Sequence, residues 1–249
     1  MYNTGQALKQ IGDENAISRS LVGNLLKAQG VLMRSNSESH RKDFFDEAAF
    51  EKLNEASEYW LGFIFGDGYV ARRSEGNAVL QVTLKSSDLP HLEKLKKFLK
   101  SSTKIKADKQ WSTNRLVVTS RKLVDTLEKY GITQRKSFTA KVRDRNLLKS
   151  RHFWRGLIDA DGGIYNGLIG SRRFFELYLV GSKSMVTQFG EFVKERIIEN
   201  KNRVRPHSSI YRIRFAGRTA VPVIAFLYSN CSVFLERKKQ LADYILLKQ

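Results

Sequence analysis

The hydrophobic pattern of the first half of the chain switches repeatedly between helical spacing and strict alternation. Apolar residues at helical spacing run from Phe50 through Leu53 and Ala56 to Trp60, which predicts a helix that begins at Asp46 as N-cap and ends before Gly68. The following pattern predicts strands and helices by their periods of 2 and 3.6 residues. These are a strand over 78–86, a helix over 88–101, strands over 104–108 and 115–119, and a helix over 122–130.

The second half repeats this order of elements. An apolar helix ends at Asp161 and Gly162, and strand patterns follow in residues 174–181, 203–206 and 211–215. Helical spacing covers about 184–198 and about 219–228. The two halves are offset by about ninety-odd residues, which is typical of a duplicated domain and not of a solenoid.

Residues 1–34 predict a small helical unit that stands before the repeat. Ile17, Leu21 and Leu25 recur every four residues, with Ser18 as a plausible N-cap and Gly30 as a C-terminal stop. The pattern resembles a helix-turn-helix whose second helix would present Arg19, Asn24 and Lys27 to a major groove. The alternative is an amphipathic hairpin that packs on the main body. Residues 35–45 are polar without apolar periodicity and predict a linker.

Each half contains an apolar helix that stops at Asp-Gly, in the segments WLGFIFGDGYV (60–70) and WRGLIDADGGI (154–164). Small residues four apart, Gly62 with Gly66 and Gly156 with Ala160, would share one face of each helix. Helices that pack through such faces approach closely, which would bring Asp67 and Asp161 together. Two carboxylates at adjacent negative helix ends repel each other unless a cation lies between them. Hard oxygen ligands favour Mg²⁺ or a similar ion.

The two segments resemble the paired signature motifs of the LAGLIDADG homing endonucleases, in the single-chain form with two copies. The second copy fits at seven of nine positions and departs only at Trp154 and Arg155. The first copy has Trp60 in place of the leading Leu and Phe65 in place of the earlier acid. The resemblance implies an α+β fold over residues 46–249, with two pseudo-symmetric αββαββα units (46–145 and 146–249) that form a saddle on duplex DNA.

Composition independently favours a nucleic-acid partner. The chain has 44 Lys and Arg against 25 Asp and Glu, a formal net charge of +19, which indicates a polyanionic partner through counterion release. Four-stranded antiparallel sheets with helices on one face would leave the other face open to double-stranded DNA. Side chains expected to contact DNA are Arg72, Gln81, Thr83, Lys85, Ser86, Lys104, Lys106, Asn114, Arg115, Tyr178, Arg203, Arg205, Arg212 and Arg214. The halves differ, so a site of roughly twenty base pairs would be asymmetric.

The resemblance also implies the chemistry. Asp67 and Asp161, with the preceding Gly66 and Ala160, would form a site for Mg²⁺, which Mn²⁺ can replace, and the protein would cut both strands to leave 3′ overhangs. Lys136 and Lys238 match positions where the family tends to place a lysine near the scissile phosphate. Lys85 matches a polar position near the first site, whereas the second half has Gly181 or Ser182 there. For each lysine the alternative is phosphate contact without catalysis.

Two other functions stay open at this point. A non-cleaving DNA-binding regulator would be expected to lose one or both motif acids, and this chain keeps both. A maturase that binds intron RNA could retain the motifs. The four histidines show no metal-ligand spacing. With one cysteine, no membrane-length apolar run and no signal-peptide layout, we expect an unexported protein that is cytoplasmic (bacterial or phage-encoded) or organellar. We also expect a monomer.

Overall fold

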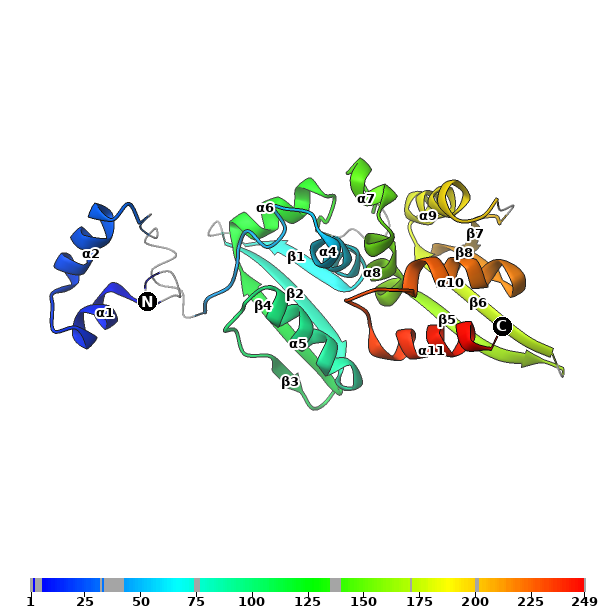
Figure 1. Cartoon of the computed structure of the whole chain (residues 1–249), viewed down its shortest axis with the longest axis horizontal. Coiled ribbons are helices and arrows are strands. Elements are labelled where there is room, and N and C mark those ends of the chain that lie inside the picture. Colours follow the sequence, from blue (N-terminus) through cyan, green and yellow to red (C-terminus); the bar gives the residue numbers. More distant parts are fainter. Residues whose placement is uncertain are drawn as a thin grey trace.

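The computed structural model describes residues 2, 6–31, 33, 43–73, 77–134, 140–170, 172–199 and 202–248, without the side chains of residues 169 and 172 (Figure 1). Its helices are α1 (Leu8–Glu14), α2 (Arg19–Ala28), α4 (Glu55–Asp67), α5 (Leu89–Phe98), α6 (Arg121–Lys129), α7 (Arg145–Lys149), α8 (Arg151–Asp161), α9 (Lys183–Arg196), α10 (Ala220–Tyr228) and α11 (Glu236–Leu247). Its strands are β1 (Gly68–Arg72), β2 (Ala78–Lys85), β3 (Lys106–Asp108), β4 (Thr113–Thr119), β5 (Gly162–Ile169), β6 (Arg172–Gly181), β7 (Arg205–His207) and β8 (Ile210–Ala216).

The strands form two antiparallel four-stranded sheets of the same topology. Their orders are β1-β2-β4-β3 and β5-β6-β8-β7, so the duplicated α+β arrangement expected from the sequence is confirmed. In Figure 1, α4 and α8 lie at the centre of the main body with one sheet on either side. Gly68, which follows α4, pairs with Val82, and Gly162, which follows α8, pairs with Leu179. This shared register defines which residues of the two halves are equivalent.

Alternation along the strands separates a helix-covered face of each sheet from an open face. In β2 the side chains of Val82 and Leu84 are buried, whereas Thr83 and Lys85 are exposed. In β8 Ile213 and Phe215 are buried and Arg214 is exposed. The buried residues join one core with the central helices and α5, α6, α9 and α10. None of the described helices combines the length and the apolar character needed to cross a bilayer.

The first central helix begins later than the sequence predicts. Asp46 caps a turn, accepting from the N–H of Ala48, and α4 starts at Glu55. Asn54 forms a capping box there, because its side chain accepts from the Ser57 N–H while the Ser57 hydroxyl accepts from the Asn54 N–H. A reciprocal cap of this kind fixes a helix start more strongly than a single acid does. The apolar spacing upstream therefore belongs to a turn that packs on the core, with Phe50 fully buried.

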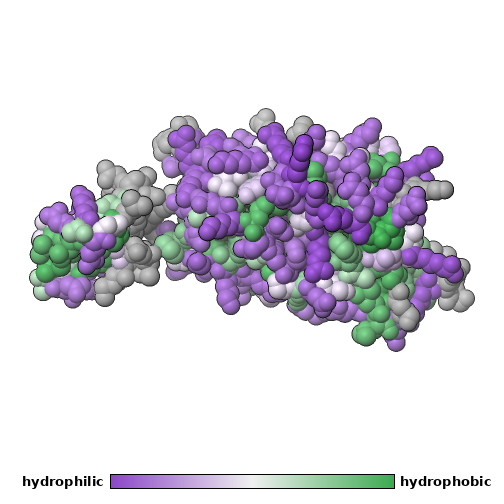
Figure 2. Space-filling view, turned by 45° about the horizontal axis from the view of Figure 1, so that its top comes forward, coloured by the Kyte–Doolittle hydropathy of each residue, from purple (hydrophilic) through white to green (hydrophobic). Residues whose placement is uncertain are grey.

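The N-terminal helices α1 and α2 have a small core of their own, formed by Tyr2, Ile11 and Val22. The Ser18 side chain accepts from the Leu21 N–H and caps α2, and Gly30 has a φ of +71° after its end, as predicted. Val22 is buried in this core, whereas Leu21 and Leu25 are 45% and 50% exposed. Figure 2 shows apolar surface gathered on this unit, whereas polar side chains cover most of the main body in that view.

Candidate functional site

Helices α4 and α8 pack backbone against backbone through their glycines. A Cβ atom placed on Gly62 would lie 1.9 Å from the carbonyl oxygen of Phe153, and one placed on Gly156 would lie 2.0 Å from the carbonyl oxygen of Tyr59. No larger residue fits at either place without separating the helices. The small-residue faces read from the sequence therefore form the contact between the two halves.

This contact continues to the C-terminal ends of both helices, where the two motif acids lie. A Cβ atom placed on Gly66 would be 2.4 Å from the Cβ of Ala160 and 3.0 Å from the carboxylate oxygen Oδ2 of Asp161. The Asp161 carboxylate thus reaches across to the residue that precedes Asp67. Asp67 is exposed and Asp161 is partly exposed. The structure therefore brings together, at one solvent-accessible point, all four residues of the predicted metal site.

Lys238 lies beneath this point, and its ammonium group holds the end of α8. Its Nζ donates to the carbonyl oxygens of Ile158, Asp159 and Gly162 at 2.6, 2.8 and 2.7 Å. Burial lowers the pKa of Lys238 to about 8, against the opposing effect of the Asp159, Asp67 and Asp161 carboxylates. The side chain is 5% exposed and all three of its hydrogens are used. Lys238 is therefore placed to support the acids, and a direct contact with a phosphate does not fit its position.

Replacing Lys238 with Met is expected to lower the free energy of unfolding by about 3 kcal/mol. The change leaves three carbonyl oxygens at the end of α8 without their donor and removes the positive charge that favours the ionised form of the buried Asp159. Urea unfolding followed by tryptophan fluorescence measures this loss, since Trp60 and Trp154 are both buried on the central helices.

Arg237→Met is the matched control for Lys238. Arg237 also carries a positive charge, but its side chain is largely exposed and forms an ion pair with Asp88 at 3.2 Å. Exposed pairs contribute less than about 1 kcal/mol. Equal losses from the two substitutions would contradict the supporting role of Lys238.

Asp159, the earlier acid of the second motif, is fully buried and ties three segments together. It accepts from the Tyr59 hydroxyl at 2.7 Å, the Tyr228 hydroxyl at 2.6 Å and the Leu235 N–H at 2.8 Å. Burial raises its pKa, and Lys238 and these hydrogen bonds oppose the rise. Sequence reasoning assigned Asp159 no role of its own, because its partners lie far along the chain in α4, α10 and the loop before α11. Its position inside the protein makes it a structural acid, unlike the exposed Asp67.

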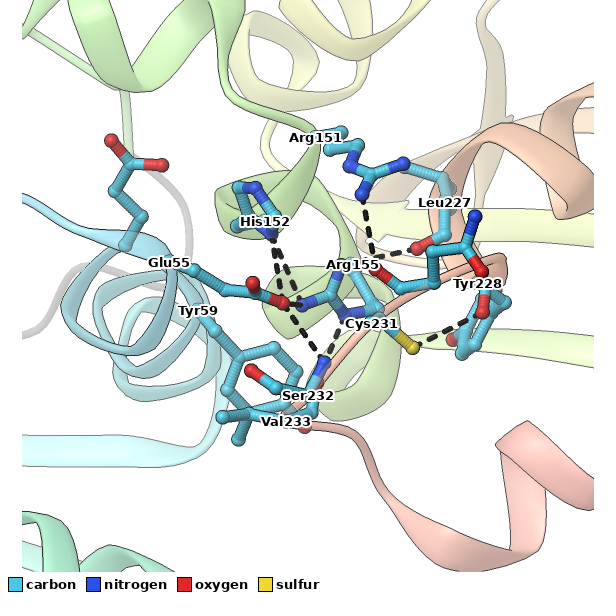
Figure 3. Close-up of polar contacts among 12 residues, drawn as sticks. Glu55, Tyr59, Arg151, His152, Arg155, Leu227, Tyr228, Cys231, Ser232 and Val233 are labelled. Atoms are coloured by element: carbon cyan, nitrogen blue, oxygen red, sulfur yellow. Dashed lines mark hydrogen bonds and ion pairs between the residues drawn. The ribbon is translucent and has the colours of Figure 1, made fainter.

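Arg155, one of the two departures from the second motif, is buried in the same interface (Figure 3). Its guanidinium donates to the carbonyl oxygens of Val233 and Leu227 at 2.9 and 3.1 Å and to Glu55 at 3.2 Å. The Glu55 carboxylate also accepts from the Ser232 N–H at 2.9 Å. The substitution thus creates a partly buried ion pair between α8 and the first half, which also orders the loop between α10 and α11.

Most of the side chains expected to contact a partner lie on the open faces of the two sheets. Register places Lys106 opposite Arg115 in the first sheet and Arg205 opposite Arg212 in the second, so each pair shares a face. The remaining residues on or beside these faces are Gln81, Thr83, Lys85, Lys104, Tyr178, Arg203 and Arg214. Ser86 is exposed just beyond β2. The described part of each sheet therefore presents a basic strip, and the two acids lie between the sheets.

Two residues expected on the open face lie elsewhere. Arg72 alternates with Tyr69 and Ala71, so it points to the helix side and forms ion pairs with Asp125 and Glu128 of α6, both at 2.5 Å. Asn114 is buried and donates to the Ser86 hydroxyl at 3.1 Å. Both expectations were wrong because a strand position one residue out of phase points to the opposite face.

The lysines expected near the acids have different positions. Lys136 lies outside the described residues. Lys85 is exposed on β2, three residues beyond the Val82 that pairs with Gly68. By the same register its equivalent is Ser182, whose side chain caps α9 by accepting from the Met185 N–H. The second half therefore has a buried capping serine where the first has an exposed lysine.

Comparison with known proteins agrees with this geometry. Residues 54–133 match the family model described as a LAGLIDADG-like domain. The chain carries a LAGLIDADG-like domain. The matched segment is the half whose motif is the weaker of the two by residue identity, and it spans α4 to the end of α6. No curated protein matches the sequence.

Solved structures match both halves of the LAGLIDADG fold. The meganuclease I-AabMI bound to uncleaved DNA has a TM-score of 0.56 at 14% identity, over 78% of this chain and 90% of that chain. The homing endonuclease I-SmaMI bound to cleaved DNA has a TM-score of 0.55 at 15% identity, over 78% and 88%. The homing endonuclease I-LtrWI bound to target DNA has a TM-score of 0.54 at 14% identity, over 78% and 90%. At these identities the similarity establishes a shared fold.

The packing of the central helices explains why the LAGLIDADG-like domain lacks the earlier acid of the motif. Phe65 occupies that place in the first half, and its ring packs edge-on against Phe153 at 5.8 Å between centroids. The equivalent place in the second half is Asp159 with its two tyrosines. One copy of the position is therefore filled by an aromatic contact and the other by a hydrogen-bonded acid, and both serve the helix interface.

Proposed function

We propose that this protein is a site-specific endonuclease that makes a metal-dependent break in both strands of duplex DNA. The observation that carries the proposal is the junction of Asp67 and Asp161 at the ends of α4 and α8, between two sheets with basic open faces. The solved structures with this fold support it, since they are described as meganucleases or homing endonucleases bound to DNA. Both halves are on one chain, so we expect a monomer to be sufficient.

The donor set at this junction fits Mg²⁺ or Mn²⁺. Two carboxylates converge where the negative ends of two helix dipoles meet, and Gly66 and Ala160, which precede them, would offer backbone carbonyl oxygens as further ligands. No group of three or more His, Cys, Asp or Glu side chains forms a metal cage among the described residues. The protein ligands are therefore few, and phosphate oxygens of bound DNA would complete the coordination.

The residues of the chain supply binding and orientation. A divalent ion held by Asp67 and Asp161 would activate a water molecule and neutralise charge on the leaving 3′ oxygen. Lys238 fixes the end of α8 and thereby the position of Asp161. Arg115 and Arg214, on the open faces, would neutralise phosphates and hold the duplex over the junction. We expect short 3′ overhangs, because the two acids lie close together and would cut across the narrow minor groove.

Incubation with DNA tests the proposal directly. The insertion-less allele of the locus that holds this gene is the substrate, with Mg²⁺ in one reaction and Ca²⁺ in the other. We expect a double-strand break with Mg²⁺ and binding without cleavage with Ca²⁺. Binding without any nicking in Mg²⁺ would favour a regulator, and preferential binding of the intron transcript would favour a maturase.

We further propose that α1 and α2 form a helix-turn-helix that binds DNA beside the main site. Residues 15–18 form a four-residue turn between the helices, with Ala16 at a φ of +54°. A Cβ atom placed on Gly12 would lie 2.6 Å from the Ile17 carbonyl oxygen, so the turn requires glycine there. Short turns of this kind orient the second helix for a major groove. Arg19, Asn24 and Lys27 are exposed on α2.

Arg19→Ala is expected to weaken binding to long duplexes by about tenfold and to reduce the salt dependence by about one phosphate contact. Binding to a short duplex that covers only the main site should stay unchanged, because α2 would have no DNA to contact. Titrations at several salt concentrations measure both effects. Lys9→Ala removes the same charge from α1 and is the control. A loss of affinity that is equal on long and short duplexes would contradict the proposal.

A further inference from the structure

One carboxylate lies within the basic open face of the second sheet. Glu176 on β6 forms ion pairs with Arg212, through Nη2, and with Arg214, through Nη1 at 3.6 Å, both from β8. The Glu176 side chain is 8% exposed, so these arginines and the strands around it cover it. The Arg212 side chain is 28% exposed, which leaves part of its guanidinium accessible from the open face.

The Tyr178 ring packs against the same guanidinium, on the side that faces the sheet. The Cζ of Arg212 lies 4.2 Å from the centroid of that ring, within the range of a cation–π contact. The ring in turn lies directly on Gly163, because a Cβ atom there would be 2.5 Å from the ring carbon Cζ of Tyr178. Gly163 is the cross-strand partner of Tyr178. Arg212 is therefore held by a carboxylate and by an aromatic ring that itself rests on the backbone of β5.

The first sheet has the arginine without its supports. The shared register makes Arg115 the equivalent of Arg212, and it makes Val79, Gln81 and Val117 the equivalents of Glu176, Tyr178 and Arg214. Arg115 is exposed, and a valine, Val79, stands where the second half has its carboxylate. The two halves thus place an arginine at the same point of the open face, but only the second half holds it with a carboxylate and an aromatic ring.

We propose that Glu176 is a positioning residue for base recognition, which orients Arg212 to read a guanine in the half of the DNA site bound by the second sheet. This inference rests on the proposed function. A carboxylate on a surface that binds phosphates weakens non-specific affinity through repulsion. It is useful where the orientation of a guanidinium matters, because base reading requires fixed geometry and phosphate contact does not.

The free donors of Arg212 match one base edge. Glu176 takes a hydrogen from Nη2, and Nε is buried, so the accessible hydrogens are those on Nη1 and the second one on Nη2. Two parallel N–H groups fit the O6 and N7 acceptors of guanine in the major groove. Antiparallel strands can enter this groove. Lysine could neutralise a phosphate equally well but cannot present such a pair of donors.

A selection from duplexes randomised over more than the expected site length tests the proposal. The protein binds the pool in Ca²⁺, and the retained duplexes are sequenced for the wild type, Glu176→Gln, Arg212→Lys and Arg115→Lys. We expect the wild type to select guanine at one position that Arg212→Lys loses. Glu176→Gln should reduce that preference by roughly tenfold and leave the other positions unchanged. Arg115→Lys should leave this guanine preference unchanged, because Arg115 lies on the other sheet and no carboxylate stands at the position equivalent to Glu176.

A second measurement separates positioning from general stability. Glu176→Gln is expected to bind a fixed, unselected duplex a few-fold more tightly than the wild type, because a negative charge leaves the DNA-binding face. Its thermal unfolding should match the wild type within a few degrees. An unchanged guanine preference in Glu176→Gln, or an equal loss of preference at every position, would overturn the proposal. If the wild type selected no sequence at all, the proposed site-specific function itself would fail.

Discussion

Asp161→Asn and Asp67→Asn are each expected to abolish cleavage of both DNA strands while DNA binding is largely kept. Each change removes one charge from a junction where two helix ends and two carboxylates converge. The amide keeps the size of the side chain but binds a hard divalent ion far more weakly. Because bound metal contributes several kcal/mol to phosphodiester hydrolysis, the rate should fall by roughly a thousandfold or more.

A plasmid that carries the target sequence reports both strands in one assay. Supercoiled, nicked and linear forms are separated on a gel over time, and affinity is measured in parallel with Ca²⁺. Asp108→Asn is a suitable control, since Asp108 is an exposed acid on β3. If either variant nicked one strand at the wild-type rate, the two acids would act separately and would not share metal ions.

Gly156→Ala is expected to destabilise the protein by at least about 3 kcal/mol, with loss of cleavage as a consequence. The added methyl group would lie 2.0 Å from the Tyr59 carbonyl oxygen, and a backbone atom cannot rotate away as a side chain can. The central helices must separate, which opens the most tightly packed contact between the halves. Their C-terminal ends would separate with them, so Asp67 and Asp161 would no longer share a cation.

Gly23→Ala provides a matched control in another helix. A Cβ atom there would lie 3.8 Å from the nearest atom, a side-chain carbon of Leu8, which is ordinary van der Waals contact. Alanine favours a helix interior over glycine by up to about 1 kcal/mol. In urea unfolding followed by tryptophan fluorescence, the midpoint should fall to a lower urea concentration for Gly156→Ala and should not fall for Gly23→Ala. Comparable curves for Gly156→Ala and the wild type would contradict the close packing of α4 and α8.

The elements and the helix contact could be predicted from the sequence because they depend on local period and residue size. Strand alternation around Val82 and Ile213 and the small faces of the motif helices are of this kind. The start of α4 was misplaced because the capping box at Asn54 and Ser57 outweighs the apolar spacing upstream. The face of Arg72 was wrong because one residue of strand phase decides it.

Other features depend on contacts between distant parts of the chain and leave no local signal. Asp159 binds Tyr59, Tyr228 and the backbone of Leu235, none of which is its neighbour in sequence. Lys238 is buried under α8 because of where α11 packs. The sequence around Lys238 shows a basic residue but does not show that it is buried. Glu176 lies in a strand of mixed character, and its ion pairs with Arg212 and Arg214 depend on the packing of β6 against β8.

The bonds that run from α4 to the second half limit how the two halves could be recombined. The Tyr59 hydroxyl donates to Asp159, and the Glu55 carboxylate accepts from Arg155, so each half carries one member of a buried pair and one member of a partly buried pair. The open faces of the sheets share no such pairs with each other in the described residues. A chimaera that joins this first half to the second half of another protein would therefore acquire the DNA-binding face of that second half. The two halves would pack correctly only if the foreign half also had an arginine to pair with Glu55 and an acid to accept from Tyr59.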